Sequence, residues 1–136
     1  MRDTKGYIYF AIKTDDANID LLDFEEYLSI QPTKFEKMFQ RGKVPKATSW
    51  NYYSENLVNP NYFEEIERLI TILEVHADEF KKLKLKYPEM IFVLEVVIYM
   101  GKETPGLHFS KRTIKFINSM DAVIDCDIYP DSNCRQ

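Results

Sequence analysis

Alternating apolar and polar positions predict strands at four places in the chain. In residues 6–14, Ile8, Phe10 and Ile12 fall on one face of an extended backbone, because successive side chains of a strand point to opposite faces. Residues 90–100 are so rich in Ile, Val, Leu and Phe that they fit a central strand covered on at least one face. Two further strands are expected at residues 49–54 and 122–129.

Apolar residues at steps of three and four predict helices between these strands. In residues 19–28, Leu21, Phe24 and Leu28 form one stripe, and Pro32 closes the helix. The longest periodic segment spans residues 62–87. Its stripe consists of Phe63, Ile66, Ile70, Leu73, Ala77 and Phe80.

The long helical segment is expected to bend. Unbroken, it would be about 39 Å long, whereas a compact chain of this size has a radius of gyration of about 14 Å. We expect the bend near residues 75–78, with Asp78 capping the second part.

A further helix is expected after Ser110, whose hydroxyl is placed to cap it. Phe109 and Ile114 have the spacing of a hydrophobic staple, and Ile114 and Ile117 continue the apolar stripe. No GxSxG motif surrounds Ser110, so it is interpreted as a cap and not as a nucleophile.

The order of elements predicts an α+β fold. The sheet is expected to be mainly antiparallel with helices packed on one face: a ferredoxin-like βαββαβ core plus a C-terminal helix and strand. The irregular stretch 33–46 leaves room for one more short strand. We expect a single domain over residues 1–136, with a frayed tail at 131–136.

Composition supports one globular unit. Of the 136 residues, 45% are apolar and 29% are charged, and the net charge is −4, which does not match disorder or a linker. No apolar run is long enough to span a membrane, and the N-terminus lacks the apolar core of a signal peptide, so a cytoplasmic protein is expected. Cys126 and Cys134 form no CxxC pair.

The predicted strands place tyrosines and carboxylates on one sheet face. This face has two interpretations, an ordinary solvated surface or a recognition surface with rigid aromatic anchors. Unpaired buried carboxylates are costly, so the face is expected to be at least partly wet or lined by donors. The residues concerned are Tyr7, Tyr9, Glu95, Tyr99, Asp125, Asp127 and Tyr129.

Asp125 and Asp127 are the most suggestive pair on that face. Their Cα atoms are expected about 6.6 to 6.8 Å apart, close enough to share a cation or to act as an acid and a base, with Glu95 as a further carboxylate. The alternative is an exposed strand face, or an ion pair with Arg41 or Lys43. No catalytic residue, metal site or cofactor is assigned.

A local basic patch surrounds Gly42 in an otherwise acidic chain. Its cations are Lys34, Lys37, Arg41, Lys43 and Lys46. Nearby, Trp50 and Tyr52 are expected on the same side of the second strand, and they join Arg41 and Gly42 among the candidate binding residues.

The remaining reactive side chains favour structural roles. His76 and His108 have no second ligand at a metal spacing, and His108, in a loop, is the better functional candidate of the two. Cys126 alternates with isoleucines and is expected to be a small buried hydrophobe. An exposed tyrosine face invites comparison with RNA-binding modules, but carboxylates and a negative net charge oppose phosphate binding.

Several short motifs occur in order along the chain. They are Gln31-Pro32-Thr33, Arg41-Gly42, Ser49-Trp50, Pro105-Gly106-Leu107-His108-Phe109-Ser110 and Asp125-Cys126-Asp127-Ile128-Tyr129. In these motifs the chain resembles the bacterial domain of unknown function 4279 family over nearly its whole length. The resemblance implies a fold and a bacterial cytoplasmic setting, and no assigned chemistry.

Two functional hypotheses follow. The first is a non-enzymatic module that binds another protein through the mixed face and the basic loop, with an immunity or toxin-neutralising role as one version. The second is a small-ligand-binding or hydrolytic domain that uses Glu95, Asp125, Asp127 and His108. Neither a membrane nor nucleic acid is expected as a partner, and the oligomeric state is left open.

Overall fold

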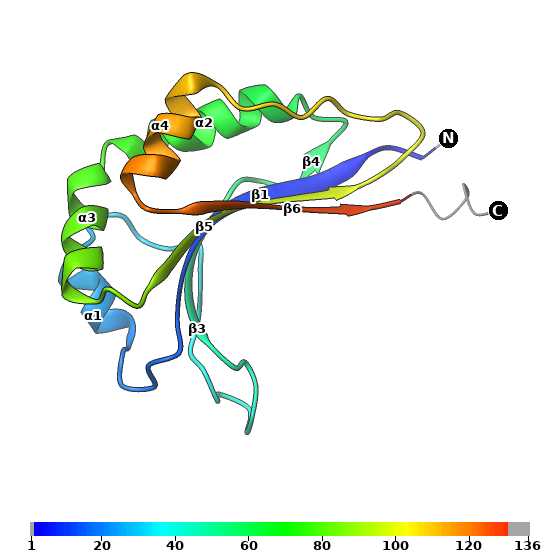
Figure 1. The fold of residues 1–136 in the computed structure, drawn as a ribbon. Coiled ribbons are helices and arrows are strands. Elements are labelled where there is room, and N and C mark those ends of the chain that lie inside the picture. Colours follow the sequence, from blue (N-terminus) through cyan, green and yellow to red (C-terminus); the bar gives the residue numbers. More distant parts are fainter. Residues whose placement is uncertain (1, 131–136) are drawn as a thin grey trace.

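The computed structural model describes residues 2–130 and shows a mixed α+β fold. In this part of the chain, a six-stranded, mostly antiparallel sheet carries four helices on one face (Figure 1). The strands are β1 (Lys5–Thr14), β2 (Lys34–Glu36), β3 (Thr48–Tyr53), β4 (Leu57–Val58), β5 (Ile91–Tyr99) and β6 (Val123–Tyr129). The helices are α1 (Leu21–Glu25), α2 (Tyr62–Glu74), α3 (Ala77–Lys86) and α4 (Lys111–Ser119).

The sheet has the strand order β2-β3-β1-β5-β6, and β4 pairs with the start of β1. β1 is antiparallel to both β3 and β5, and the pair of β5 and β6 is parallel. The expected succession strand, helix, strand, strand, helix, strand is present, and β2 is the extra short strand in the irregular stretch. The expected frayed tail at 131–136 and Cys134 lie outside the described residues.

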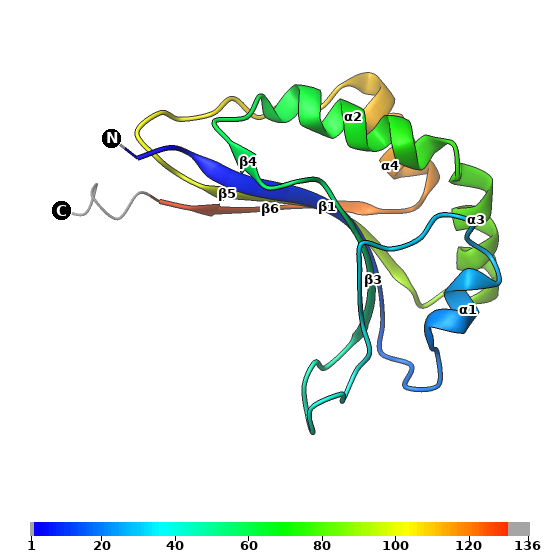
Figure 2. The same cartoon turned by 180° about the vertical axis from the view of Figure 1, so that it is seen from behind.

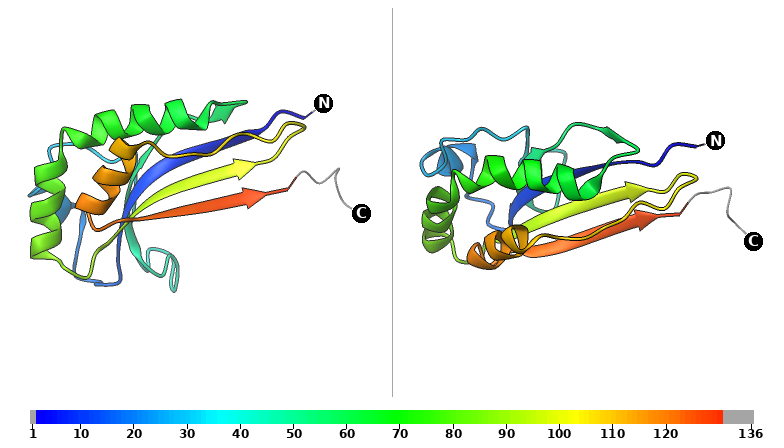
Figure 3. Two further views of the ribbon diagram at one scale, coloured as in Figure 1. Left: turned by 45° about the horizontal axis from the view of Figure 1, so that its top comes forward. Right: turned by 90° about the horizontal axis from the view of Figure 1, so that it is seen from above.

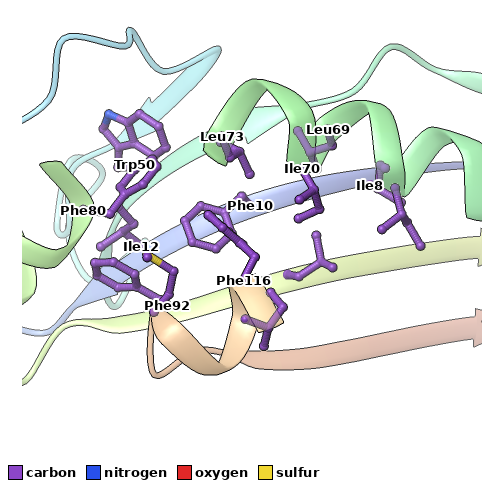
Figure 4. Packing of buried hydrophobic residues seen from close by; sticks show 14 of the residues in the cluster. Ile8, Phe10, Ile12, Trp50, Leu69, Ile70, Leu73, Phe80, Phe92 and Phe116 are labelled. Atoms are coloured by element: carbon purple, nitrogen blue, oxygen red, sulfur yellow. The ribbon is translucent and has the colours of Figure 1, made fainter. Parts of the chain in front are cut away.

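The core lies between the sheet and the helices. Ile8, Phe10 and Ile12 of β1 are fully buried on the helix side, as their alternation predicts. The ring of Phe10 contacts Phe80 of α3 and Phe116 of α4 at centroid distances of 5.4 and 5.9 Å (Figure 4). The part of this sheet face that the helices cover is therefore dry and closely packed.

The long helical segment is broken near the expected position. α2 ends at Glu74 and α3 begins at Ala77. The predicted capping role of Asp78 is wrong: His76 is the N-cap residue, without a side-chain cap hydrogen bond, and Asp78 already lies in the first turn. There its charge complements the helix dipole without capping the helix.

The first helix is shorter than predicted, because its cap comes later in the chain. Asp20 is the N-cap residue and forms a capping box with Asp23. The helix therefore begins at Leu21, and it ends at Glu25, before Leu28. Phe24 and Leu28 are still buried, so the apolar stripe correctly marks the contact with the core.

Ser110 caps α4 as predicted, because its hydroxyl oxygen accepts a hydrogen bond from the backbone N–H of Thr113 at 3.1 Å. The staple prediction is wrong, since Ile114 is exposed. The buried side of α4 carries Thr113, Phe116 and Ile117 instead. Three- and four-residue spacing fits more than one stripe in so short a helix, and the packing on α2 selects this one.

The prediction of a buried Cys126 is also wrong. Cys126 lies on the helix side of β6 but is exposed. β6 is an edge strand, and α4 lies only near its start (Figure 3). Alternation identifies the face of a strand, but it does not tell how far a helix covers that face.

The sheet bends strongly, and the helices lie on the outer side of the bend (Figure 1). One arm contains β6, β5 and the start of β1. The other arm contains β3, and residues 37–47 project from its end away from the helices (Figure 2). The inner side of the bend is the sheet face that no helix covers. Within residues 2–130, no helix is long and apolar enough to cross a membrane.

Candidate functional site

The open sheet face collects the tyrosines and carboxylates expected from strand alternation. Tyr9 of β1 is paired with Glu95 of β5, and Glu95 is paired with Asp125 of β6, so the three side chains lie in one row on one face. Asp127 lies two residues further along β6 on the same face. We name this surface the tyrosine–carboxylate face, and it consists of Tyr7, Tyr9, Tyr53, Glu95, Tyr99, Asp125, Asp127 and Tyr129.

The tyrosine rings of this face contact one another across strands. Tyr9 stacks on Tyr53 of β3 at a centroid distance of 4.2 Å, and Tyr99 stacks on Tyr129 of β6 at 5.0 Å. Tyr7 lies between the two stacks, 6.0 Å from Tyr9 and 6.4 Å from Tyr99. Such cross-strand pairs stabilise the sheet and hold the rings in fixed positions.

Three carboxylates converge beside these rings. One oxygen each of Glu95, Asp125 and Asp127 can be chosen so that all three lie within 4.8 Å of one another. Glu95 is buried, whereas Asp125 is exposed and Asp127 is partly buried. Burial raises the pKa of Glu95, and the two aspartates raise it further.

Glu95 has partners within the chain. Lys13 of β1 lies 3.7 Å from its carboxylate, and the Tyr9 hydroxyl donates a hydrogen bond to it. Within residues 2–130, Asp125 and Asp127 form no ion pair. Their negative charge is therefore directed to solvent and is available to a cationic group.

The hydroxyls of Tyr7, Tyr9 and Tyr53 remain protonated at neutral pH. A hydrogen bond to Tyr99, together with burial, raises the pKa of Tyr7 to about 12. Burial and the nearby Glu95 carboxylate raise the pKa of Tyr9 even more, and burial raises the pKa of Tyr53. These side chains therefore offer neutral hydroxyl donors and apolar rings, which add no negative charge to the face.

Trp50 does not belong to the surface. Trp50 and Tyr52 do lie on the same side of β3, but this is the helix side. Trp50 is 1% exposed and packs edge-on against Phe80 at 5.9 Å, so a role as an exposed anchor is wrong. Tyr52 is half-buried and lines a groove between β3 and α2 together with Leu69.

His108 is also separate from the carboxylates. Its ring stacks on Phe63 of α2 at a centroid distance of 4.3 Å, in the helix layer. The expected grouping of His108 with Glu95, Asp125 and Asp127 is therefore wrong. The loop position of His108 gave no information about which side of the sheet the loop would cover.

Arg41 and Gly42 lie in the projecting segment 37–47, which we name the basic hairpin. The backbone N–H of Arg41 donates to the carbonyl of Val44 at 2.9 Å, and Gly42 has a left-handed φ of 72°. The alternative ion pair of Arg41 or Lys43 with the aspartates is absent from the described chain.

Tyr53 of this face, and Lys13, the ion-pair partner of Glu95, were not among the residues predicted from the sequence. Tyr53 lies next to Trp50 and Tyr52 in the sequence but on the opposite face, stacked on Tyr9. The strand alternation already contained this signal, because residues 50 and 52 share one side and residue 53 must face the other. The same alternation places Lys13 on the side of Tyr9, but its pairing with Glu95, which is distant in the sequence, had no local signal.

A comparison with known families confirms the family resemblance that the short motifs indicated. A family model described as a domain of unknown function, DUF4279, matches residues 4–131. The chain belongs to the DUF4279 family. Membership assigns no activity to this DUF4279 chain. No curated protein and no solved structure matches the chain significantly.

Proposed function

We propose that this DUF4279 chain is a non-enzymatic protein-interaction module, whose tyrosine–carboxylate face binds an arginine- or lysine-rich segment of a partner protein. The observation that carries the proposal is the combination of stacked tyrosines with two ion-pair-free aspartates on a face that no helix covers. Tyrosine is enriched in protein interfaces, where its ring contributes contact area at a low entropic cost.

The charge of the face supports a basic partner. Lys13 pairs with Glu95, and Lys34 pairs with Glu36, so these two cations are engaged. Lys5 is exposed at the other end of the face, in register with Tyr99, and forms no ion pair with either aspartate. Asp125 and Asp127 are left to pair with a group from outside. A guanidinium group suits this position, because it can form paired hydrogen bonds with a carboxylate and stack on an aromatic ring.

A toxin-neutralising role is one version of this proposal. A basic surface on a toxin would be covered by the acidic face, and complementary charge would accelerate association. The strand order and directions around β1 also support the ferredoxin-like description of the core, in which the sheet face opposite the helices is free.

A peptide titration tests the proposal. The probe is a synthetic peptide of alternating Arg and Gly, and a matching Glu and Gly peptide is the reference. We expect the Arg peptide to bind the dilute protein and the Asp125→Asn/Asp127→Asn variant to bind it at least about tenfold more weakly, a loss of about 1.4 kcal/mol. Glu25→Gln/Glu89→Gln is the control, because it changes the charge equally at exposed positions outside the face.

Two results would overturn the proposal. One is the absence of Arg-peptide binding at about 0.1 M salt, where the Debye length is about 10 Å. The other is equal weakening by the control variant, which would indicate attraction to net charge alone. If Ca²⁺ or Mg²⁺ instead binds in a manner that requires Asp125 and Asp127, the ligand-binding hypothesis gains support, since hard cations prefer oxygen ligands.

A further inference from the structure

The basic hairpin presents cationic groups that the described chain leaves unpaired. It projects from the end of β3, beyond the cover of the helices (Figure 2). Arg41, Lys43 and Lys46 are exposed, and none forms an ion pair within residues 2–130. The turn at Gly42 holds Arg41 and Lys43 at the tip.

Two apolar side chains of the hairpin, near these cations, are exposed to solvent. Phe39 is 51% exposed and Val44 is 49% exposed. Phe39 has a φ of 62°, in the left-handed region that costs a residue with a side chain about 1 to 2 kcal/mol. Its neighbour Met38 is buried, so this backbone conformation keeps the Phe39 ring outside while the chain returns to the core. An exposed aromatic ring in a strained position points to a contact outside the chain.

The tyrosine–carboxylate face is complementary to this tip. The hairpin offers unpaired cations next to an exposed aromatic ring. The face offers the aspartates Asp125 and Asp127 next to the stacked pair Tyr99 and Tyr129, whose rings are about half exposed. In the single chain the two surfaces do not meet, because Arg41 and Lys43 form no ion pair with either aspartate.

We propose that the basic hairpin of one chain docks on the tyrosine–carboxylate face of a second copy, and that the second copy does the same in return. The bent sheet fits this reciprocal docking, because the hairpin projects from the end of one arm, whereas β5 and β6, which carry Tyr99 and the two aspartates, form the other arm (Figure 1). Two arms of this shape can clasp about a two-fold axis, which closes the assembly as a dimer. This inference rests on the proposed function, since it names the hairpin as a basic segment for the same face.

The dimer would regulate access to the face. Both faces are occupied in the clasped pair, so a partner with a basic segment competes with the second copy. The apparent affinity for the Arg peptide therefore falls as the protein concentration rises.

Sedimentation equilibrium with charge-reversal variants tests the inference. We expect a wild-type dimer that dissociates between about 0.1 and about 1 M salt, as screening shortens the Debye length to about 3 Å. Two charge reversals should each weaken the dimer at least about tenfold: Arg41→Glu/Lys43→Glu in the hairpin and Asp125→Lys/Asp127→Lys on the face. An equimolar mixture of the two variants should form a heterodimer, because each hairpin then meets a face of opposite charge. Lys81→Glu/Lys82→Glu, at exposed positions of α3, is the control. Circular dichroism and denaturant unfolding establish that each variant is folded.

The outcomes separate this inference from the proposed function. A wild-type monomer that still binds the Arg peptide overturns the dimer and leaves the proposed function intact. A dimer that neither reversal weakens, or two reversals whose mixture stays monomeric, also overturns the exchange. Loss of both dimerisation and Arg-peptide binding in the folded wild-type protein overturns both proposals.

Discussion

Lys13 and Glu95 form an ion pair of 3.7 Å between β1 and β5, and the two partners differ greatly in exposure. The Lys13 side chain is 40% exposed, whereas that of Glu95 is 8% exposed. The carboxylate is therefore desolvated more than the ammonium group, and the pair does not fully compensate, since burial still raises the pKa of Glu95 above its ordinary value.

Replacing Glu95 with Gln should stabilise the fold at neutral pH. A raised pKa means that the folded state holds the proton more tightly than the unfolded chain does. Stability therefore falls as the pH rises from the unfolded value, about 4.3, through the folded value. The neutral amide avoids this loss. We expect Glu95→Gln to raise the free energy of unfolding at pH 7 by on the order of 1 kcal/mol, and to give no gain near pH 4, as measured by urea unfolding.

A matched control for this variant is Glu36→Gln, which removes a carboxylate paired with Lys34 at 3.6 Å nearer the sheet edge. We expect a change within about 0.5 kcal/mol there, as for other exposed ion pairs. A loss of stability in Glu95→Gln at pH 7 would contradict the prediction, because it would mean that the Lys13 contact outweighs the burial of charge.

The tyrosine stacks predict a loss of stability at alkaline pH. The pKa of Tyr7 is raised to about 12, and those of Tyr9 and Tyr53 are also raised. The folded state thus retains phenol protons that the unfolded chain loses from pH 10 upward, so stability declines as the pH rises through this range. We expect the decline to be shallower in Tyr7→Phe than in the wild type, as followed by denaturant unfolding at several pH values.

Tyr27→Phe serves as the control for the alkaline experiment, since Tyr27 lies on the helix side near Tyr87. Phenolate absorbance gives a second readout. In the folded protein, Tyr7→Phe should remove the part of the absorbance change that occurs near pH 12. If the absorbance change that is lost in Tyr7→Phe is instead centred near pH 10, the pKa of Tyr7 is not raised in the folded protein, and the prediction is wrong.

Strand alternation could predict much of the candidate surface from the sequence. A period of two fixes the side of each residue within its strand, which is why Tyr9, Glu95 and Asp127 share a face. The same alternation placed Trp50 and Tyr52 on one side of their strand. It did not indicate whether this side faces the helices or the solvent. That choice depends on the pairing of Trp50 with Ile12, whose own side chain faces the helices.

Contacts between distant segments could not be predicted in this way. His108 lies on Phe63 because the loop before α4 returns over the helix layer, and no local pattern encodes that path. Cys126 is exposed because α4 is too short to cover β6. Local spacing thus predicts faces and caps, while coverage is decided by how far each helix extends over the sheet.

The cap of α4 predicts a pH-dependent contribution to stability. Glu67 of α2 accepts hydrogen bonds from Ser110 and from Thr113, and Arg112 lies 3.4 Å away. The Ser110 hydrogen bond, with help from Thr113 and Arg112, lowers the pKa of Glu67. Stability from this carboxylate is therefore present above the unfolded value, about 4.3, and is lost as the pH falls through the lower folded value.

Glu67→Gln should accordingly lose about 1 to 2 kcal/mol of unfolding free energy at pH 7. This is toward the lower end of the range of about 1.5 to 3 kcal/mol for hydrogen bonds to a charged group, because the side chain is partly exposed. The deficit should shrink at about pH 3, where the wild-type carboxylate is increasingly protonated. Glu64→Gln, at an exposed position of the same helix, is the comparison and should change stability little. Equal losses in both variants would show that helix charge, and not the link to α4, determines the effect.

A side chain at Gly6 should cause the largest loss of stability among these variants, because α2 and β5 approach the start of β1 closely at this position. A Cβ atom at Gly6 would lie 2.1 Å from the carbonyl oxygen of Val97 and 2.3 Å from the hydroxyl of Tyr62, which is itself buried. We expect Gly6→Ala to cost about 2 to 4 kcal/mol in urea unfolding, since a backbone carbonyl must shift. Adding Tyr62→Phe should recover only part of this, because the Val97 clash remains. Gly106→Ala meets nothing within 4 Å and should be tolerated; a similar cost there would contradict the steric explanation.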